Sequence, residues 1–363
     1  MTPHGGDVWQ LSEDLGIPEG EFLDFSANIN PRGLPPAARE RLARDAANAR
    51  LLSRYPDPSA RTLRRALSER LDIPAEAIAA GPGAESLLAP ILRCLRADRA
   101  LVPVPAFSEY RRVCELHDIE FTPFVLDRSG CFRLSVDRFC ERIAVGSFGV
   151  ALVNNPHNPS GAMLEHHDVL RIWETARSSA QALVLDEAFI DYIPQASLAR
   201  EAVARPGLIV LRALTKFYGC PALRIGYAIA HPETVRRIQS LLPTWGITQF
   251  AIDALTEAVA DSVYAEASIE ENANERARLT DSLAGLGLVV YPSAANYLLI
   301  ELPPNTVATS ELRMRMAANH RVLIRNCDSY EGLATGRYLR VAVRSFEDNR
   351  RLTQALAEEL RMP

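Results

Sequence analysis

Short apolar runs alternate with amphipathic stretches between about residue 60 and residue 250. Runs of this kind are typical of strands buried on both faces, and the stretches between them, such as 165–179, have the periodicity of helices. The runs predict strands at 100–104, 149–154, 182–186, 208–214 and 225–230. Since strands separated by helices indicate a parallel sheet covered on both faces, we predict an α/β fold.

The alternation ends after about residue 255. A polar, helix-favouring segment (256–285) leads into LVVYPSAANYLLIEL, a further helix, VLIRNC and YLRVAVRS. This less regular order predicts a smaller α+β domain. We therefore expect an N-terminal segment (1–47) that joins the small domain or the rim of the functional site, a large domain (48–258) and a small C-terminal domain (259–363).

Composition restricts the class of protein. The chain has 363 residues, of which 48% are hydrophobic, enough to bury one large core or two. Its formal net charge of −5 lacks the basic excess of a nucleic-acid or membrane-surface binder, so we expect neither partner. The start lacks the pattern of a signal peptide, and no apolar stretch is long enough to cross a bilayer. We expect a cytoplasmic protein.

The six cysteines form no CxxC pair, and no Cys/His cluster has zinc-ligand spacing. We expect reduced thiols and no metal site. Lysine usage is more informative, because only Lys216 is a lysine among the 40 basic residues. A compositional bias toward arginine explains the rest. Arginine cannot act as an amine nucleophile, so a site that forms a Schiff base must keep its lysine.

Three charged residues lie at or near the ends of predicted strands. Asp186 ends the strand QALVLD, where open α/β sheets bind ligands, although it is also suited to a turn or a helix cap. Lys216 and Arg224 lie in LTKFYGCPALRIGY, and each alone is typical of a solvated surface charge. Together the three supply a Schiff-base amine, a partner for a pyridinium nitrogen and a phosphate ligand.

Two turns and an aromatic residue add to this set. NNPHNPSG is a turn by composition, and it places the Asn158 amide where it can contact a phenolic oxygen. In AAGPGAES, the residues Gly83, Ala84 and Glu85 begin a helix and present free N–H groups to a phosphate, although a plain turn is the commoner use of such a motif. Phe107 suits either ring stacking or the core.

The series GPGAES, PAFSEY, NPHNPSG, DEAFIDY, LTKFYGCPALRIGY and RVAVRS resembles the fold-type-I aminotransferase superfamily, and within it the histidinol-phosphate aminotransferase group, along essentially the whole chain. HGGDVW, LDFSANINPRGLP, SRYPDPSARTLRRAL and YLRVAVRS are similar to the L-threonine-O-3-phosphate decarboxylase family. The resemblance implies a pyridoxal 5'-phosphate enzyme. It would decarboxylate L-threonine O-3-phosphate to (R)-1-amino-2-propanol O-2-phosphate for cobalamin biosynthesis.

The resemblance also implies roles for single residues. It makes Lys216 the Schiff-base lysine, Asp186 the pyridinium partner, Asn158 the ligand of the phenolic oxygen and Phe107 the stacking ring. It surrounds the cofactor phosphate with Gly83, Ala84, Thr215 and Arg224.

Further matched positions concern the substrate and a second subunit. Tyr55 would reach the phosphate of the neighbouring subunit's cofactor, which implies a homodimer with shared active sites. Arg325 and Arg340 match two substrate-binding arginines, and His4 and Asn30 match substrate-side positions.

Two positions depart from the family pattern. Phe189 stands where many relatives have a tyrosine, which favours decarboxylation over transamination. Ala213 replaces a hydroxyl residue three positions before the lysine, so we expect weaker cofactor retention. The main alternative is a histidinol-phosphate-type aminotransferase. A cofactor-sensing regulator would need a DNA-binding module, for which the sequence offers neither spare chain nor a basic patch.

Overall fold

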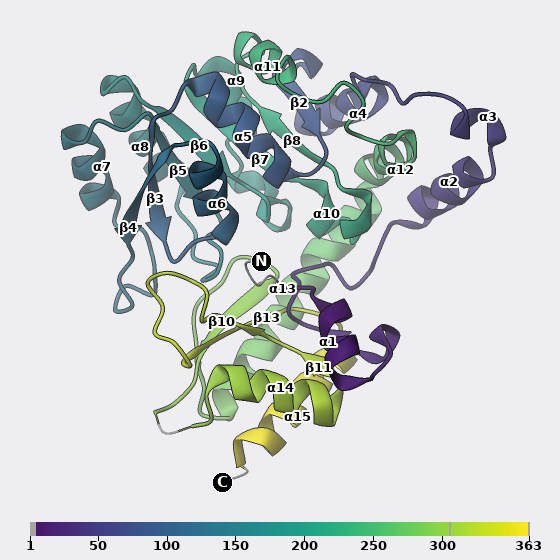
Figure 1. Ribbon diagram of the computed structural model, residues 1–363, viewed down its shortest axis with the longest axis vertical. Helices are drawn as coiled ribbons and strands as arrows, with labels where there is room; N and C mark the ends of the chain where they lie inside the picture. Colours follow the sequence, from purple (N-terminus) through teal and green to yellow (C-terminus); the bar gives the residue numbers. More distant parts are fainter. Residues whose placement is uncertain (1–4, 305, 362–363) are drawn as a thin grey trace.

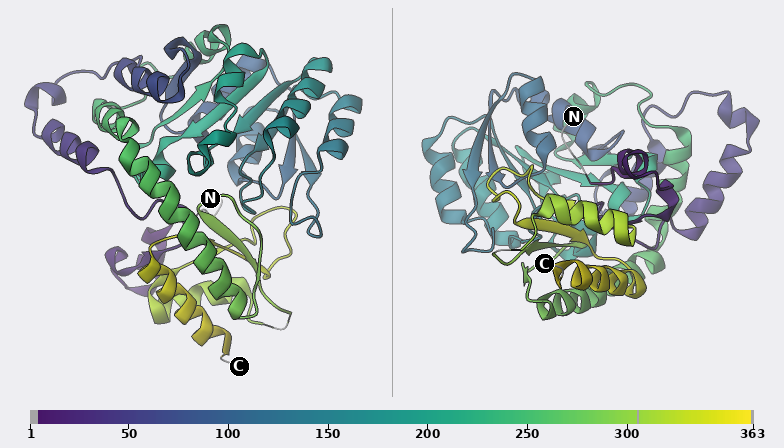
Figure 2. Two further views of the ribbon diagram at one scale, coloured as in Figure 1. Left: turned by 180° about the vertical axis from the view of Figure 1, so that it is seen from behind. Right: turned by 60° about the horizontal axis from the view of Figure 1, so that its bottom comes forward.

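The computed structural model describes residues 5–304 and 306–361. Figure 1 shows a larger part built around one sheet and a smaller part below it. The long helix α13 (Ser262–Gly285) runs from the larger part into the smaller one, as the view from behind in Figure 2 shows. Within these residues no helix is both long and apolar enough to cross a membrane.

The central sheet has the strand order β2-β8-β7-β6-β5-β3-β4. The strands β7, β6, β5, β3 and β4 are parallel, whereas β8 is antiparallel to both of its neighbours. The strand bounds are β2 (Ile78–Gly81), β3 (Arg99–Val104), β4 (Glu120–Val125), β5 (Val150–Asn154), β6 (Ala182–Asp186), β7 (Leu208–Ala213) and β8 (Gly226–Ile229).

Helices cover both faces of this sheet, which explains the continuous apolar runs. In β5, Ala151 and Val153 point into one core and Val150 and Leu152 into the other. The helices of the larger part are α2 (Pro36–Ala46), α3 (Ala49–Leu52), α4 (Arg61–Leu71), α5 (Ala84–Leu95), α6 (Ser108–Leu116), α7 (Val136–Val145), α8 (His166–Ser178), α9 (Ala199–Ala204), α10 (Leu214–Phe217), α11 (Pro232–Gln239) and α12 (Gln249–Ala260). Short 3-10 turns complete it: η2 (Ala75–Ala77), η3 (Ile190–Tyr192), η4 (Pro194–Ala196) and η5 (Pro221–Leu223).

The smaller part packs α13, α14 (Thr309–His320) and α15 (Phe346–Arg361) against an antiparallel sheet of order β12-β13-β10-β9. Its strands are β9 (Val289–Val290), β10 (Tyr297–Glu301), β12 (Arg325–Asn326) and β13 (Tyr338–Ala342).

The N-terminal segment connects the two parts. After α1 (Val8–Leu15) and η1 (Glu19–Glu21), the strand β1 (Leu23–Asp24) pairs in parallel with β11 (Val322–Leu323) of the smaller part. The chain then crosses to the larger part, where the Asn30 backbone N–H donates to the Lys216 carbonyl at 3.0 Å. Helix α2 packs on α12 of the larger part. The segment therefore passes directly over the residues that bear the candidate chemistry.

Each of the five runs in the sequence contains or overlaps a strand, and the sheet is mostly parallel, as predicted. One of the five strands runs in the opposite direction. The run at 225–230 contains β8, which is antiparallel to β7 rather than parallel. The chain between them holds only the one-turn helix α10 and the turn η5, whereas a parallel return requires a full crossover. The strands β2 and β4 were not predicted.

Candidate active site

The two parts enclose a cavity of about 900 Å³ at the carboxyl ends of β5, β6 and β7. Open α/β sheets bind ligands at this edge, and the volume is that of a small-molecule site. The sequence candidates that line it are Ala84, Glu85, Phe107, Asn158, Asp186, Thr215, Lys216, Arg224, Arg325 and Arg340.

Asp186 is the last residue of β6, and its backbone and side chain are both fixed. Its carbonyl accepts hydrogen bonds from Asn154 Nδ2 (2.8 Å) and the Asn155 backbone N–H (2.9 Å). Its carboxylate accepts from the Tyr110 hydroxyl at 2.6 Å and the Ala188 N–H at 2.9 Å. Burial raises the pKa of Asp186, although both bonds and the charge of Lys216 oppose this. The carboxylate is thus held rigidly toward the cavity.

Lys216 lies in the one-turn helix α10, directly after β7. Burial is the main cause that lowers the pKa of its amine to about 8, and the nearby Arg340 and Arg224 guanidinium groups act in the same direction. At neutral pH its unprotonated fraction is therefore roughly 300 times that of a lysine with the ordinary pKa. An amine of this kind is a competent nucleophile toward an aldehyde.

The start of helix α5 forms a cradle with Arg224. A Cβ on Gly83 would lie 2.8 Å from Arg224 Nη2, and a Cβ on Gly226 would lie 2.3 Å from the Ala84 backbone nitrogen. Glycine at 226 lets strand β8 approach the helix so closely, and Gly83 has a φ of +101°, a conformation that favours glycine. The Gly83 N–H, expected to be free, donates to the Gly81 carbonyl at 2.8 Å, so the N–H groups available to a ligand are those of the first turn of α5, from Ala84 onward. Such groups beside a guanidinium favour a phosphate, so this cradle fits the phosphate of the expected cofactor.

The Asn158 amide is oriented by Arg340. Arg340 Nη1 lies 2.7 Å from Asn158 Oδ1, and the Asn158 backbone N–H donates to Asn154 Oδ1, also at 2.7 Å. Because a guanidinium only donates, the amide oxygen is engaged and the amide NH₂ is left to donate to a ligand. This orientation suits a phenolic oxygen.

His157, which precedes Asn158, belongs to the scaffold. Its Nε2 lies 2.8 Å from the Pro105 carbonyl and its Nδ1 lies 2.7 Å from Ser160 Oγ. Since a carbonyl only accepts, Nε2 carries the proton and Nδ1 accepts from the serine. Burial lowers the pKa of His157 to about 4, so the ring stays neutral and joins the NPHNPSG turn to the loop before α6.

Arg325 and Arg340 are direct neighbours across the antiparallel pair β12 and β13. The Tyr330 side chain joins them: its hydroxyl accepts from Arg340 Nη1 at 3.1 Å, and the Arg325 guanidinium lies 5.7 Å from the centre of its ring. Arg340 Nη2 donates to the Ser26 carbonyl (2.9 Å), while its buried Nε has no partner in the described residues. Two adjacent guanidinium groups favour an anionic ligand.

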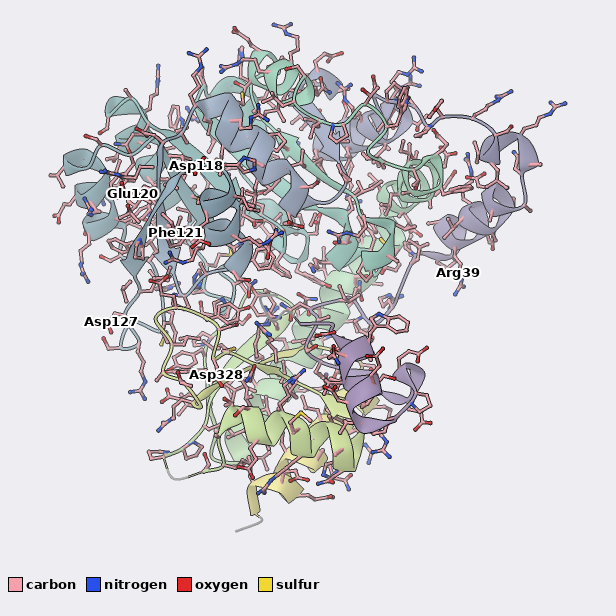
Figure 3. All side chains as sticks on the ribbon, viewed as in Figure 1. Arg39, Asp118, Glu120, Phe121, Asp127 and Asp328 are labelled. Carbon is pink, nitrogen blue, oxygen red and sulfur yellow. The ribbon has the colours of Figure 1, made fainter. Side chains whose placement is uncertain are left out.

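The acids close to these arginines in sequence are engaged elsewhere. Glu331 pairs with Arg111, at 2.5 Å. Asp328, labelled in Figure 3, accepts hydrogen bonds from Thr309 Oγ1 and the Gly336 N–H.

Phe107 caps helix α6 and lines the cavity. Its ring meets that of Tyr110 edge to face, with the ring centres 5.7 Å apart. Phe189 and Ala213 also line the cavity, so the two departures from the family pattern both face the ligand space. Phe189 packs edge to face against Tyr297.

Among the described residues, three predicted ones do not line this cavity: Gly83, which lies behind Arg224 in the cradle, Asn30 and Tyr55. The Asn30 amide donates instead to the Phe217 carbonyl (2.8 Å), Ser268 Oγ (3.0 Å) and Tyr264 Oη (3.1 Å), and so joins the N-terminal segment to the rest of the fold. The residue of this segment that lines the cavity is Asn28. Tyr55 is 78% exposed and stacks on Trp245, with ring centres 4.4 Å apart. His4 lies outside the described residues.

Sequence reasoning missed Tyr110 and Tyr330. Tyr110 stands in PAFSEY, three residues after Phe107, and Tyr330 in the loop after VLIRNC. The only available signal for Tyr110 was its position three residues after Phe107, which is the spacing of one helical face. In the part of the chain that is described, no group of three or more His, Cys, Asp or Glu side chains is arranged to hold a metal ion.

Comparisons with known proteins agree with this geometry. The model of the family "Aminotransferase class I and II" matches residues 20–356. The chain is 34% identical to threonine-phosphate decarboxylase of Salmonella typhimurium, over 99% of this chain and 97% of that one. It is 30% identical to the adenosylcobalamin biosynthesis bifunctional protein CobDQ of Leptospira interrogans, over 98% of this chain but 41% of that protein. The histidinol-phosphate aminotransferase structure from Clostridium acetobutylicum superposes with a TM-score of 0.84 at 25% identity, covering 93% of this chain and 98% of that one.

Proposed function

We propose, from the premise that this chain belongs to the aminotransferase class I and II family, that it is a pyridoxal-phosphate-dependent decarboxylase of L-threonine O-3-phosphate. Its products are (R)-1-amino-2-propanol O-2-phosphate and carbon dioxide, a step of cobalamin biosynthesis. The observation that carries the proposal is one cavity in which Lys216 and Asp186 face a neighbouring pair of arginines. The full-length likeness to a threonine-phosphate decarboxylase supports the choice of reaction.

The cradle of Gly83, Ala84 and Arg224 would hold the cofactor's phosphate, and Asp186 would bind its ring nitrogen. The cofactor, when bound, supplies an electron-withdrawing ring that stabilises negative charge on the substrate's Cα. The ionised Asp186 carboxylate keeps a proton on that nitrogen. Asn158 donates to the phenolic oxygen with the amide group that Arg340 leaves available.

Lys216 holds the cofactor between turnovers and then moves a proton. When the carboxylate leaves as carbon dioxide, the electron pair of the broken bond remains with Cα, and the product requires one proton there. The half-buried Lys216 amine lines the cavity, and its pKa, lowered to about 8, suits it to deliver that proton. Because Phe189 has no hydroxyl, it cannot donate to the phenolic oxygen or take part in this transfer.

The two arginines decide which substrate is held and how. Charge-assisted, forked contacts from Arg325 and Arg340 bind the phosphate and the carboxylate of the substrate. As neighbours on β12 and β13, they would hold the substrate's phosphate and carboxylate in one orientation relative to Lys216 on the other side of the cavity. We assign the functional unit as a homodimer in which the exposed Tyr55 reaches the neighbouring subunit's cofactor phosphate.

The deciding experiment measures carbon dioxide released from L-threonine phosphate without a keto acid, and glutamate formed from histidinol phosphate with 2-oxoglutarate. We expect release of carbon dioxide and little glutamate. Of Arg325→Ala and Arg340→Ala, the variant that loses the phosphate ligand should lower kcat/KM for threonine phosphate about ten- to hundredfold and that for threonine much less. The variant that loses the carboxylate ligand should lower kcat/KM for both substrates. The matched control is Arg350→Ala, which removes an exposed arginine paired with Glu347.

Rapid glutamate formation with no carbon dioxide would identify the chain as a histidinol-phosphate-type aminotransferase instead. If both arginine variants reduce the two substrates equally, the arginines do not read the phosphate. The assignment of a phospho-amino-acid substrate then loses its physical basis.

A further inference from the structure

Tyr110 is a buried side chain that no part of the proposed mechanism yet uses. It is the third residue of helix α6 and only 2% exposed, and it lines the cavity together with Asp186. Its hydroxyl donates to Asp186 Oδ2 at 2.6 Å. Its ring packs in the same core as Leu88 and Val184, so the phenol is carried by a rigid helix and a packed face.

The Asp186 carboxylate is therefore gripped from two sides. Tyr110 binds Oδ2 from helix α6, and the Ala188 N–H binds Oδ1 from the loop after β6, at 2.9 Å. Two donors on different elements prevent rotation of the carboxylate about its last bond. Each carboxylate oxygen can accept two hydrogen bonds, so after these contacts a lone pair remains for a ligand in the cavity.

The phenol also favours one charge state of Asp186. A hydroxyl donating to a carboxylate stabilises the ionised form, and burial opposes that form. Burial and the charge of Asp186 raise the pKa of Tyr110 well above its usual value, so the phenol remains a proton donor. A proton shared between a ring nitrogen and Asp186 is thereby kept on the nitrogen.

We propose that Tyr110 is a positioning residue that acts through Asp186, holding its carboxylate ionised and aimed at the ring nitrogen of the cofactor. This rests on the proposed function only in its use of pyridoxal phosphate and applies equally to decarboxylation and transamination. The alternative role is that of a core tyrosine whose hydroxyl merely finds a partner.

The test compares two ligands on apo-protein: pyridoxal phosphate and its analogue with carbon in place of the ring nitrogen. Tyr110→Phe should weaken binding of pyridoxal phosphate about tenfold and leave the analogue's affinity within about twofold, because only the former has the nitrogen. It should also lower kcat with little change in KM. In the Asp186→Asn background, Tyr110→Phe should have no further effect on the ratio of the two affinities.

The matched control is Tyr291→Phe, which removes a buried phenol that donates to Glu301 at 2.7 Å outside the cavity lining. It should change thermal stability without changing the ratio of the two affinities. If Tyr110→Phe folds less completely, this ratio still decides, because both affinities belong to the same folded fraction. Equal losses for the two ligands, or no loss for either, would overturn the proposal. Failure of the wild type to bind pyridoxal phosphate would instead reject the proposed function.

Discussion

At the scale of single residues, the half-buried amine of Lys216 controls how the cofactor becomes attached. Its pKa is lowered to about 8, so the amine is mostly neutral above that pH and mostly protonated below it. Only the neutral amine attacks an aldehyde. Attachment of pyridoxal phosphate to the apo-protein should therefore accelerate as the pH rises toward 8 and level off above about 9, when followed by visible absorbance in rapid mixing.

Lys216→Ala is the control for this measurement, since no other side-chain amine exists in the chain. It should bind the cofactor without the absorbance of a lysine-bound form. In the wild-type protein, borohydride reduction and peptide mapping should place the cofactor on the peptide that contains residue 216. A rate that keeps rising to about pH 10 would mean that the amine has the pKa of a solvated lysine, contrary to its burial.

The structure brings together in one cavity the residues that were singled out because chemistry restricts the residue type. Lys216, Asp186 and Arg224 stand out because few side chains provide an amine, a carboxylate or a guanidinium for these tasks. The contact between Tyr110 and Asp186 spans 76 positions and leaves no mark in periodicity. For Asn30, the family motif implied a place near the substrate. In the structure its amide instead donates hydrogen bonds to the Phe217 carbonyl and the Tyr264 hydroxyl.

At the scale of elements, the end of β7 lines the same cavity as the proposed phosphate cradle of Gly83, Ala84 and Arg224. Ala213 ends β7 and lines this cavity with Ala84 and Arg224. It stands where the family resemblance implies a hydroxyl residue. Ala213→Ser should restore one donor to the phosphate and lower the dissociation constant of the cofactor about tenfold, as measured by equilibrium dialysis.

Ala213→Val provides the matched control, because it adds volume at the same position without a donor. It should weaken cofactor binding or leave it unchanged. If serine and valine have the same effect, the space at residue 213, rather than a missing hydroxyl, determines retention of the cofactor.

The same scale shows which elements the sequence pattern could reveal. Strands β5, β6 and β7 are buried on both faces, so they appear as continuous apolar runs. β4 lies at the sheet edge with exposed residues and Pro123, which removes that signal. β2 is short and built of small residues around Ala79 and Ala80. The direction of β8 follows from the short connection after β7, which is too short for a helical crossover, and not from the apolar pattern of the strand itself.

At the scale of the whole molecule, the N-terminal segment and helix α13 tie the two parts together around the cavity. β1 pairs with β11 in the smaller part, and Asn30 then binds the backbone of Lys216 in the larger part. Tyr264 in α13 donates to the Gly33 carbonyl at 2.6 Å and so holds the same segment from the other side. The arginines of the smaller part and the lysine of the larger part are thus kept at a fixed separation.

Tyr55 is a proposed cofactor ligand that lies on the surface, away from the lining of its own subunit's cavity. It lies between α3 and α4, is 78% exposed and stacks on Trp245, itself 53% exposed. Two stacked, exposed aromatic rings are suited to an interface, and a twofold dimer would bring Tyr55 of each subunit to the other's cavity. Active sites built in this way can be repaired by mixing two defective chains.

The prediction is that Lys216→Ala and Tyr55→Ala, each severely impaired alone, regain activity when their subunits are mixed and allowed to exchange. In a hybrid dimer one site carries both substitutions and the other carries neither. Random exchange of equal amounts therefore restores roughly a quarter of the wild-type activity. Carbon dioxide release before and after exchange measures the gain, and differently tagged subunits verify by co-purification that hybrids form. Confirmed hybrids without any gain would show that Tyr55 serves its own subunit. In that case each of the two sites in a hybrid dimer would still carry one of the two substitutions, and neither would be intact.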